Sequence, residues 1–493
     1  MQIGKKVVPL RLQIQWNDMA AKLIGRKREC KVLDDCMTSD RSEFVIVYGR
    51  RRVGKTFLVD QYFKGKFDFT FVGGHKLPKR RQLSSFGKAL RYASKGKVSA
   101  PFKDWFEAFD ALEQYLGFIK KKGKKVVFID EMPWIDNQKS EFVAALENFW
   151  NGWASRRGDI MFVASGSASS WMMDKIVDNK GGLHARITNS IYLRPFTLAE
   201  TEEYLASRKF SWDRYQIMQC YMVMGGVPYY LSLLRSGDSL VQNIDRLFFS
   251  TNAIMKVEFD ELYNAVFSKA DHYIAIVREL YRHKDGMTRK EISEATGLSG
   301  GVLSKILRNL VTCDFVGRSS RYGSKSKNVL FRLVDFYTLF YYKFVANYSG
   351  GDDIWWTHNF QTRSVESWMG ISFELLCQQH TRQIKKALGI SGISAEIFSW
   401  RKTGDSETKG AQIDMVIERS DRMIHLCEMK FSRGKYTISK EYEGWIRERI
   451  EMFRNENASG KGLICTFVST YGLSKGKHSS IVDSEVKMED LFM

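Results

Sequence analysis

The segment from Gly49 to Thr56, GRRRVGKT, has the residue types and spacing of a phosphate-binding loop, G-x-x-x-x-G-K-[ST]. Its glycines let backbone N–H groups face phosphate oxygens, while Lys55 is expected to reach the β- and γ-phosphates and Thr56 to ligate Mg²⁺. An apolar run precedes the loop and a helix-like run follows it, which is the context that the motif requires. The sequence therefore predicts an ATP site whose loop comprises Gly49, Arg50, Arg51, Arg52, Val53, Gly54, Lys55 and Thr56.

A second apolar strand, VVFIDE at 126–131, ends in two acids. Asp130 is expected to hold Mg²⁺, usually through water, and Glu131 to orient or deprotonate the attacking water. The next strand ends in SGS, where Ser165 or Ser167 could sense the γ-phosphate. The alternative is that these are surface acids and serines that follow core strands.

Another set of acids lies near the C-terminus, in GAQIDMVIERSDRMIHLCEMKFS. IDMVIE is predicted to be one strand of a hairpin, and MIHLCEMKF the other. Since side chains alternate along a strand, Glu428 and Lys430 should share a face, with Asp414 opposite and close enough to share a metal. The preceding helical segment, 371–388, supplies Glu374.

An acid followed by acid-x-lysine on the next strand is similar to the core of the PD-(D/E)xK nucleases, although Ile413 stands where that group has proline. The expected Mg²⁺ ligands are Asp414, Glu428 and Glu374, assisted by the Met429 carbonyl, with Gln412 nearby. The metal would activate water, and Lys430 would position it or neutralise the transition state. The alternative is a nuclease-like fold kept for DNA or protein contact.

The elements that must position these residues alternate between strand and helix in the first half of the chain. Continuous apolar strands favour a parallel α/β sheet. The segments are strands at 44–49, 67–74, 124–131 and 159–167, and helices at 55–63, 102–123 and 140–156. Residues 196–281 are mostly helical in pattern.

Residues 286–333 have the rhythm of a winged helix, with two short helices and a basic hairpin. Ser299 is expected to cap the second helix. The predicted apolar face consists of Ile292, Val302, Ile306 and Leu310. Lys305 and Arg308, with Arg318, Arg321, Lys325 and Lys327 of the wing, are expected to meet DNA. The alternative is a structural arm packed against the ATPase.

Composition limits the partners and the location. The formal net charge of +20 over 493 residues favours a polyanionic partner, with DNA the simplest choice and a protein partner a second possibility. No apolar stretch reaches 18 residues, so no membrane span is expected. The seven cysteines show no zinc-ligand spacing, which is typical of reduced thiols in a cytoplasmic protein.

Six segments occur in order: IGRKRE, GRRRVGKT, VVFIDEMPWID, ASGSASSWM, GGLHARIT and GGVPYYL. Together they resemble the prokaryotic AAA+/STAND-type P-loop ATPases that carry a winged helix and a C-terminal nuclease-like domain. The resemblance implies that Ile24 and Gly25 line the adenine side and that Gly226 and Pro228 touch nucleotide. The resemblance also implies an arginine finger or sensor role for Arg186, with a structural or surface salt bridge as the alternative.

The fold class expected is therefore α/β: a P-loop NTPase parallel sheet with a helical lid, a winged-helix domain and a restriction-endonuclease-like α/β domain. The expected boundaries are 1–195, 196–282, 283–347, 348–364 (a linker) and 365–493. The expected function is an ATP-hydrolysing protein acting on DNA through a nucleotide-controlled nuclease-like domain. A non-cleaving nucleotide switch is the alternative, and the oligomeric state stays open.

Overall fold

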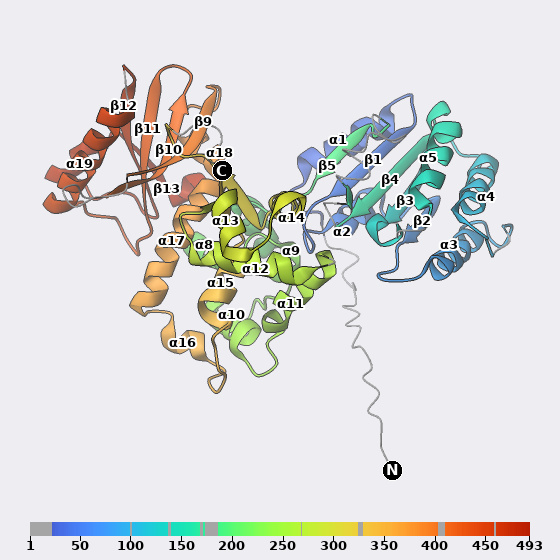
Figure 1. Cartoon of the computed structure of the whole chain (residues 1–493), viewed down its shortest axis with the longest axis horizontal. Helices are drawn as coiled ribbons and strands as arrows, with labels where there is room; N and C mark the ends of the chain where they lie inside the picture. Colours follow the sequence, from blue (N-terminus) through green and yellow to red (C-terminus); the bar gives the residue numbers. More distant parts are fainter. Residues whose placement is uncertain are drawn as a thin grey trace, which may run out of the picture.

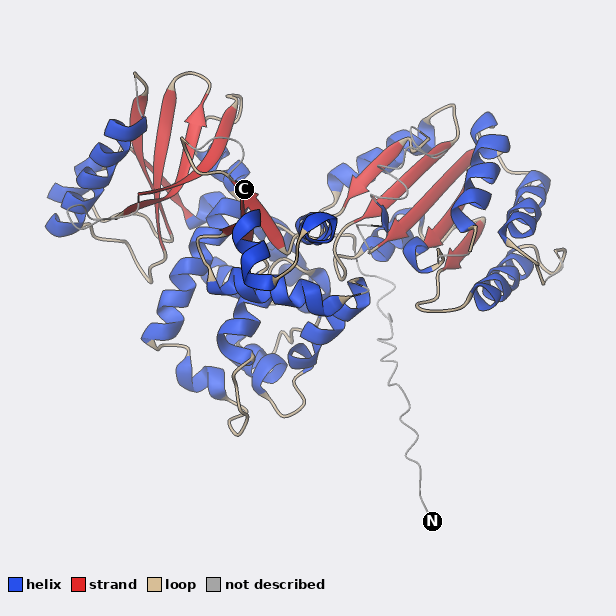
Figure 2. Cartoon of the chain, viewed as in Figure 1, coloured by secondary structure: helices blue, strands red, loops and turns tan. Residues whose placement is uncertain are grey.

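The computed structural model places one sheet at each end of the molecule, with a largely helical middle between them (Figures 1 and 2). It describes residues 22–98, 101–136, 140–167, 171–172, 186–267, 269–323, 329–402, 410–457 and 460–493. Within this part of the chain, no helix combines the length and apolar character needed to cross a membrane.

The first sheet is parallel throughout, as the continuous apolar strands predict, and its order is β2-β3-β4-β1-β5. The strands are β1 Glu43–Tyr48, β2 Phe69–Val72, β3 Lys125–Asp130, β4 Ile160–Gly166 and β5 Asn189–Tyr192. One face packs on α3 (Lys79–Ala93), α4 (Trp105–Phe118) and α5 (Phe142–Gly152), and the other on α1 (Lys27–Thr38) and α2 (Lys55–Phe63). The sequence predicted a helix that runs to Gly123, but α4 ends at Phe118 because Ile119 is extended.

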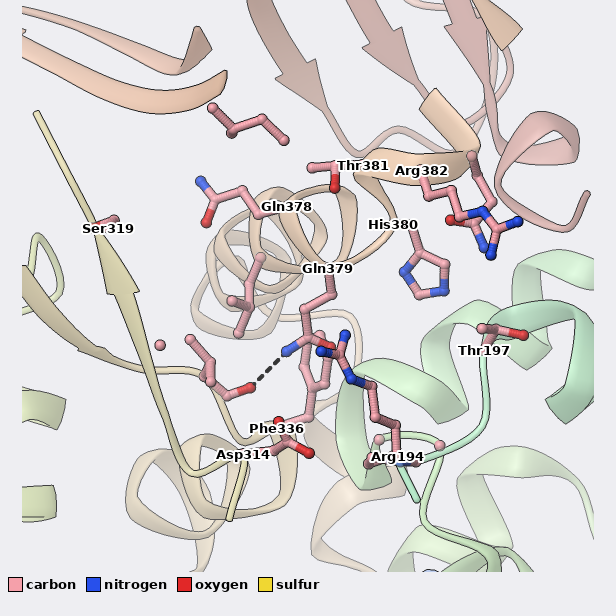
Figure 3. A pocket seen from close by; sticks show the side chains of 18 of the residues that line it. Arg194, Thr197, Asp314, Ser319, Phe336, Gln378, Gln379, His380, Thr381 and Arg382 are labelled. Carbon is pink, nitrogen blue, oxygen red and sulfur yellow. Dashed lines mark hydrogen bonds between the residues drawn. The ribbon is translucent and has the colours of Figure 1, made fainter. Parts of the chain in front are cut away.

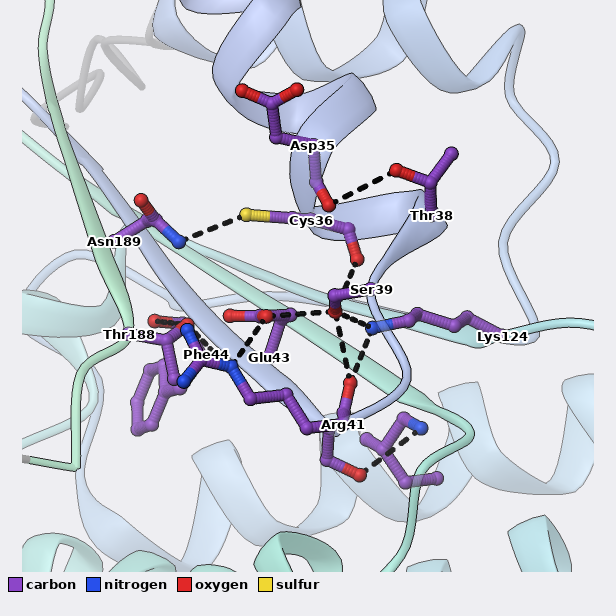
Figure 4. A network of polar contacts seen from close by, with 12 residues as sticks. Asp35, Cys36, Thr38, Ser39, Arg41, Glu43, Phe44, Lys124, Thr188 and Asn189 are labelled. Carbon is purple, nitrogen blue, oxygen red and sulfur yellow. Dashed lines mark hydrogen bonds and ion pairs between the residues drawn. The ribbon is translucent and has the colours of Figure 1, made fainter.

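A polar network closes the edge of this sheet opposite the phosphate loop (Figure 4). The Lys124 ammonium donates to Ser39 Oγ over 2.7 Å, and Ser39 Oγ donates to Glu43 Oε1 over 2.8 Å. Asn189 Nδ2 donates to Cys36 Sγ over 3.1 Å. The network thus ties the end of α1 to the start of three strands.

The helical middle begins with α7 (Leu198–Ser207), which starts at a capping box formed by Thr197 and Glu200. The remaining helices are α8 Arg214–Met224, α9 Pro228–Ser232, α10 Leu240–Ile244, a π-helical turn at Asp245–Phe249, α11 Ile254–Val266 and α12 Ala270–Arg282. This order matches the mostly helical pattern predicted for the region.

A small three-stranded sheet follows, with antiparallel order β6-β8-β7. Its elements are β6 Met287–Thr288, α13 Arg289–Thr296, α14 Gly300–Thr312, β7 Val316–Ser319 and β8 Leu330–Leu333. Two expectations for α14 were wrong. Ile306 and Leu310 of the predicted apolar face are buried, but Val302 is 56% exposed because Leu303 takes the buried position in that turn. Ser299 stands at the N-cap, but its side chain makes no capping hydrogen bond.

The C-terminal region contains α15 Phe336–Phe340, a π-helical turn Tyr341–Val345, α16 Trp355–Asn359, α17 Arg363–Gln379 and α18 Thr381–Ala387 before its sheet. The sheet has order β13-β12-β11-β10-β9 and is mixed, with β9, β10 and β11 antiparallel and β11, β12 and β13 parallel. Its elements are β9 Ala395–Lys402, β10 Ala411–Arg419, β11 Met423–Lys430, α19 Lys440–Asn457, β12 Gly462–Ser469, β13 Ser484–Lys487 and α20 Met488–Leu491. The predicted linker carries α16 and buries Trp356, whose backbone N–H donates to Asp245 Oδ1 over 2.7 Å.

The apolar core divides the molecule in a way that the sequence pattern does not show. One core runs without a break from the helical middle through the three-stranded sheet into the C-terminal region. The first sheet has separate cores on its two faces. The first sheet is therefore attached to the rest of the molecule mainly by contacts at its edge, where the phosphate loop lies.

Candidate functional sites

The phosphate loop has the backbone conformation that its glycines were expected to permit. Gly54 has φ of 87° at the N-cap of α2, where a side chain would be strained. A Cβ on Gly49 would stand 2.3 Å from the Leu193 carbonyl oxygen, so only glycine fits there. Lys55 is buried, and its ammonium donates to the Arg50 carbonyl over 2.9 Å and to the Gly49 carbonyl over 3.3 Å.

Thr56, Asp130 and Ser165 come together at the ends of neighbouring elements. Thr56 Oγ1 donates to Asp130 Oδ2 over 2.8 Å, and Ser165 Oγ donates to Asp130 Oδ1. Asp130 is buried at the end of β3. A hydroxyl and a carboxylate in contact are suitable ligands for a hard cation, directly or through water.

Glu131 lies beside this group in a left-handed conformation, with φ of 47°. Ser167 Oγ donates to Glu131 Oε2 over 2.8 Å, so the second serine of the SGS segment positions this carboxylate. Burial lowers the pKa of Lys55, while the charges of Glu131 and Asp130 oppose that shift. Arg186 is exposed in a turn before β5, and its finger or sensor role stays a prediction.

The three arginines of the loop are engaged by the helical middle and the region after β8. Arg50 forms an ion pair with Asp335 at 2.5 Å, and both side chains are only 2% exposed. Arg52 donates to both oxygens of Glu258, at 3.1 and 2.8 Å, and stacks 3.9 Å over the Tyr229 ring. Arg51 donates to the Glu261 carbonyl over 3.3 Å. Any contact of Arg50 and Arg52 with nucleotide would therefore be through the backbone.

The two segments expected to flank the nucleotide both contact the stretch from Phe196 to Glu200. Ile24 is buried, and a Cβ on Gly25 would stand 2.2 Å from Glu200 Oε1. Gly226 accepts a 2.6 Å hydrogen bond from Phe196 N–H. Pro228 begins α9, and the Tyr229 N–H donates to the Arg52 carbonyl, which joins this turn to the phosphate loop.

The C-terminal carboxylate site, defined as Glu374, Asp414, Glu428 and Lys430, is built on α17 and the β10–β11 hairpin. The Met429 N–H donates to Asp414 Oδ2 over 2.9 Å. Lys430 Nζ lies 2.7 Å from Glu428 Oε1, so the two residues share a face as predicted. Burial and then the charges of Glu428 and Glu374 raise the pKa of Asp414 to about 8. Burial also raises the pKa of Glu374.

Two partners of Glu428 were not recognised in the sequence. Arg449 of α19 binds Glu428 Oε2 at 2.8 Å, and the Tyr442 hydroxyl donates to Glu428 Oε1. The spacing of Tyr442 and Arg449 on one helical face was the available signal. In the described part of the chain, no three His, Cys, Asp or Glu side chains are grouped as a ready metal site. The oxygen donors and the mutual repulsion of the acids nonetheless suit a hard cation such as Mg²⁺.

A cleft of about 2170 Å³ joins the surroundings of the two sites. Among the described residues, its lining holds thirteen lysine and arginine side chains against eight aspartates and glutamates. Figure 3 shows Arg194 of the first sheet's edge facing Gln379, with His380 and Arg382 beside them. Asp414, Glu374 and Gln412 line the same cleft as Gly25 and Gly226. The charge excess makes it a suitable path for a polyanion.

Residues 23–234 match the model of an ATPase domain found predominantly in Archaea. An uncharacterized protein of Methanocaldococcus jannaschii is 23% identical over 438 residues, covering 86% of this chain and 91% of its own length. A Walker-type ATPase of Pyrococcus abyssi is similar with a TM-score of 0.45 and 15% identity, covering 64% of this chain and 95% of its own. The Aeropyrum pernix ORC2 protein is similar with a TM-score of 0.39 and 13% identity, covering 73% of this chain and 96% of its own.

The loop, the acid-ended strand and the domain match identify a P-loop ATPase domain in this protein. The matched ATPase domain spans residues 23–234, which include the first sheet and the helical middle as far as α9.

Proposed function

We propose that the protein uses ATP binding and hydrolysis to control a metal-dependent, nuclease-like site that acts on DNA. The observation that carries the proposal is the basic cleft, because it is lined both by residues beside the phosphate loop and by the C-terminal acids. A phosphodiester chain in this cleft would be held by cations and would lie against Asp414.

At the first site, the loop amides and Lys55 would bind the phosphates, and Thr56 and Asp130 would hold Mg²⁺. When bound, Mg²⁺ supplies neutralising charge to the β- and γ-phosphates. Glu131, held by Ser167, would orient the attacking water and accept its proton. Ser165 fixes the Asp130 carboxylate, so its action on the γ-phosphate would be indirect.

At the second site, Glu374, Asp414 and Glu428 would hold a divalent cation, which activates water and neutralises phosphate charge. Lys430 would then exchange Glu428 for the scissile phosphate or the attacking water. Arg449 and Tyr442 fix the Glu428 carboxylate from the opposite side. The three-stranded sheet with α13 and α14 would serve as a winged helix, with exposed Lys305 and Arg308 on its surface.

The second candidate is a nucleotide-dependent switch that binds DNA or a protein and cuts nothing. Its supporting observation is that Glu428 is already engaged by Lys430, Arg449 and Tyr442. Such pairing would suit a carboxylate with a structural role.

Plasmid nicking and cleavage with Mg²⁺ or Mn²⁺, with and without ATP, tests the choice. Wild type is compared with Glu428→Ala and with Glu441→Ala, a control on the exposed side of α19. ATP-dependent cutting that Glu428→Ala alone removes would support the nuclease. Absence of cutting by wild type, with ATP hydrolysis intact, would favour the switch.

A further inference from the structure

Arg332 belongs to β8 of the three-stranded sheet, where it lies opposite Gly317 of β7. Its side chain nevertheless crosses to the C-terminal region. The guanidinium Nη1 donates to Gln378 Oε1 over 3.2 Å, and Gln378 Nε2 donates to the backbone carbonyl of Asp414 over 3.0 Å. The charges of Glu374 and Asp414 both act on this guanidinium. An arginine from another sheet is thus placed beside the acids.

The strand that carries Arg332 is held between both candidate sites. On the C-terminal side, the end of the hairpin docks on β9: the Tyr322 N–H donates to the Ser399 carbonyl over 2.9 Å. The Ser399 N–H returns a bond to the Ser320 carbonyl over 3.2 Å. On the other side, Asp335 pairs with Arg50 of the phosphate loop. This part of the predicted wing therefore contacts the protein itself.

The acids of the carboxylate site already have cations acting on them without a metal. Lys430 and Arg449 bind Glu428 directly. The positive charge of Arg332 acts on Glu374 and Asp414, and Gln378 links its guanidinium to the Asp414 carbonyl. A divalent ion entering between these acids would meet the positive charge of Arg332, and like charges repel strongly in a partly buried site.

We propose that Arg332 is the resident counter-ion of the C-terminal carboxylate site, where it takes the electrostatic place of a divalent cation and holds metal affinity down. The inference rests on the proposed metal-dependent function of that site. Metal would then bind tightly only when Arg332 moves away or when a substrate phosphate supplies the missing negative charge.

Mn²⁺ binding to the nucleotide-free, full-length protein tests the proposal, with free Mn²⁺ followed by electron paramagnetic resonance. The Asp414→Asn variant gives the background from other sites. Arg332→Gln should bind Mn²⁺ at least about tenfold more tightly than wild type at that site. Gln378→Ala, which releases the guanidinium without changing the net charge, should tighten binding by a smaller factor.

Arg318→Gln is the matched control, because Arg318 is an exposed arginine on the adjacent strand β7. An equal gain in Arg318→Gln would reduce the effect to net charge and overturn the proposal. Equal affinities for wild type, Arg332→Gln and Gln378→Ala, all above the Asp414→Asn background, would overturn the counter-ion role but leave the metal site standing. Values that never exceed that background would remove the metal site itself, and the proposed nuclease function with it.

Discussion

The two candidate sites are held together in different ways. At the phosphate loop, Thr56, Asp130 and Ser165 lie at one edge of a parallel sheet and hydrogen-bond to one another. At the C-terminal carboxylate site, Glu428 is held by cations from a strand and a helix, and Arg332 arrives from a separate sheet. The first site is preformed by one motif and its neighbouring strands. The second depends on how three parts of the molecule dock.

The phosphate loop combines a backbone that is fixed locally with side chains that are fixed by distant contacts. Its backbone is set locally by Gly49 and Gly54, whereas its arginine side chains are set by distant acids. Burial lowers the pKa of Arg50, but the charge and hydrogen bond of Asp335, together with the charges of Tyr230 and Asp314, keep the net shift upward. The ion pair therefore attaches the edge of the first sheet to the remainder of the molecule. Four substitutions test whether each site depends on its own motif or on contacts between distant parts of the chain.

The largest expected effect comes from Asp335→Asn, which leaves the buried Arg50 charge without its partner. Breaking a buried ion pair costs about 3–5 kcal/mol, so the free energy of unfolding should fall by roughly that amount. Urea denaturation followed by tryptophan fluorescence measures it. Glu294→Gln, which removes an exposed pair with Lys290, should cost under about 0.5 kcal/mol. Equal small losses in both variants would show that the Arg50 contact is not a stabilising link.

Lys55→Ala should lower ATP hydrolysis by about 10²–10³-fold, because it removes a preorganised charge aimed at the phosphates. Phosphate release measures the rate, with Lys88→Ala as a control at an exposed position on α3. The free energy of unfolding should change much less than for Asp335→Asn. Hydrolysis at the wild-type rate in Lys55→Ala would contradict the assignment of this loop as the ATP site.

His380 gives a pH-dependent test of the C-terminal region. Its Nε2 accepts from the Leu198 N–H at 3.2 Å while Nδ1 bonds the Leu376 carbonyl, and burial lowers its pKa to about 4. The unfolded chain, with a histidine pKa of about 6.5, binds more protons between these values. Stability contributed by neutral His380 is therefore complete above about pH 6.5 and is lost as pH falls toward 4.

Wild type and His380→Gln should consequently converge in unfolding free energy by about 2 kcal/mol between pH 7.5 and pH 5. Urea denaturation at several pH values measures the gap, and other titrating groups cancel in the difference. A gap that is constant with pH would mean that His380 is protonated as readily in the folded protein as in the unfolded chain.

The smallest expected effect concerns the cleft. Arg382 is exposed and lines the cleft, so Arg382→Ala should weaken DNA binding a few-fold. The slope of the logarithm of the binding constant against the logarithm of salt concentration should become smaller in magnitude by about one. Fluorescence anisotropy at several salt concentrations measures both quantities. Lys88→Ala, remote from the cleft, should change neither. An unaltered slope in Arg382→Ala would place the DNA elsewhere.

Sequence reasoning predicted much of the first sheet, since buried parallel strands read as continuous apolar runs that alternate with helices. It missed α3 and β5, whose patterns are weak, and it extended α4 past Phe118. The hairpin bearing Asp414 and Glu428 was predicted correctly, because alternation along a strand fixes which residues share a face. The apolar face of α14 was misplaced by one residue at Val302, where helical spacing alone was ambiguous.

The sequence by itself determined the phosphate loop, the two acids at the end of β3 and the acids of the C-terminal hairpin. These depend on short-range geometry, in which spacing along a strand or loop fixes position. Only the tertiary structure decided that Arg50 pairs with Asp335 and that Arg332 lies beside Glu374 and Asp414. Such pairs join residues far apart in the chain, and they form because charges taken out of water together need partners that only docking can bring within reach.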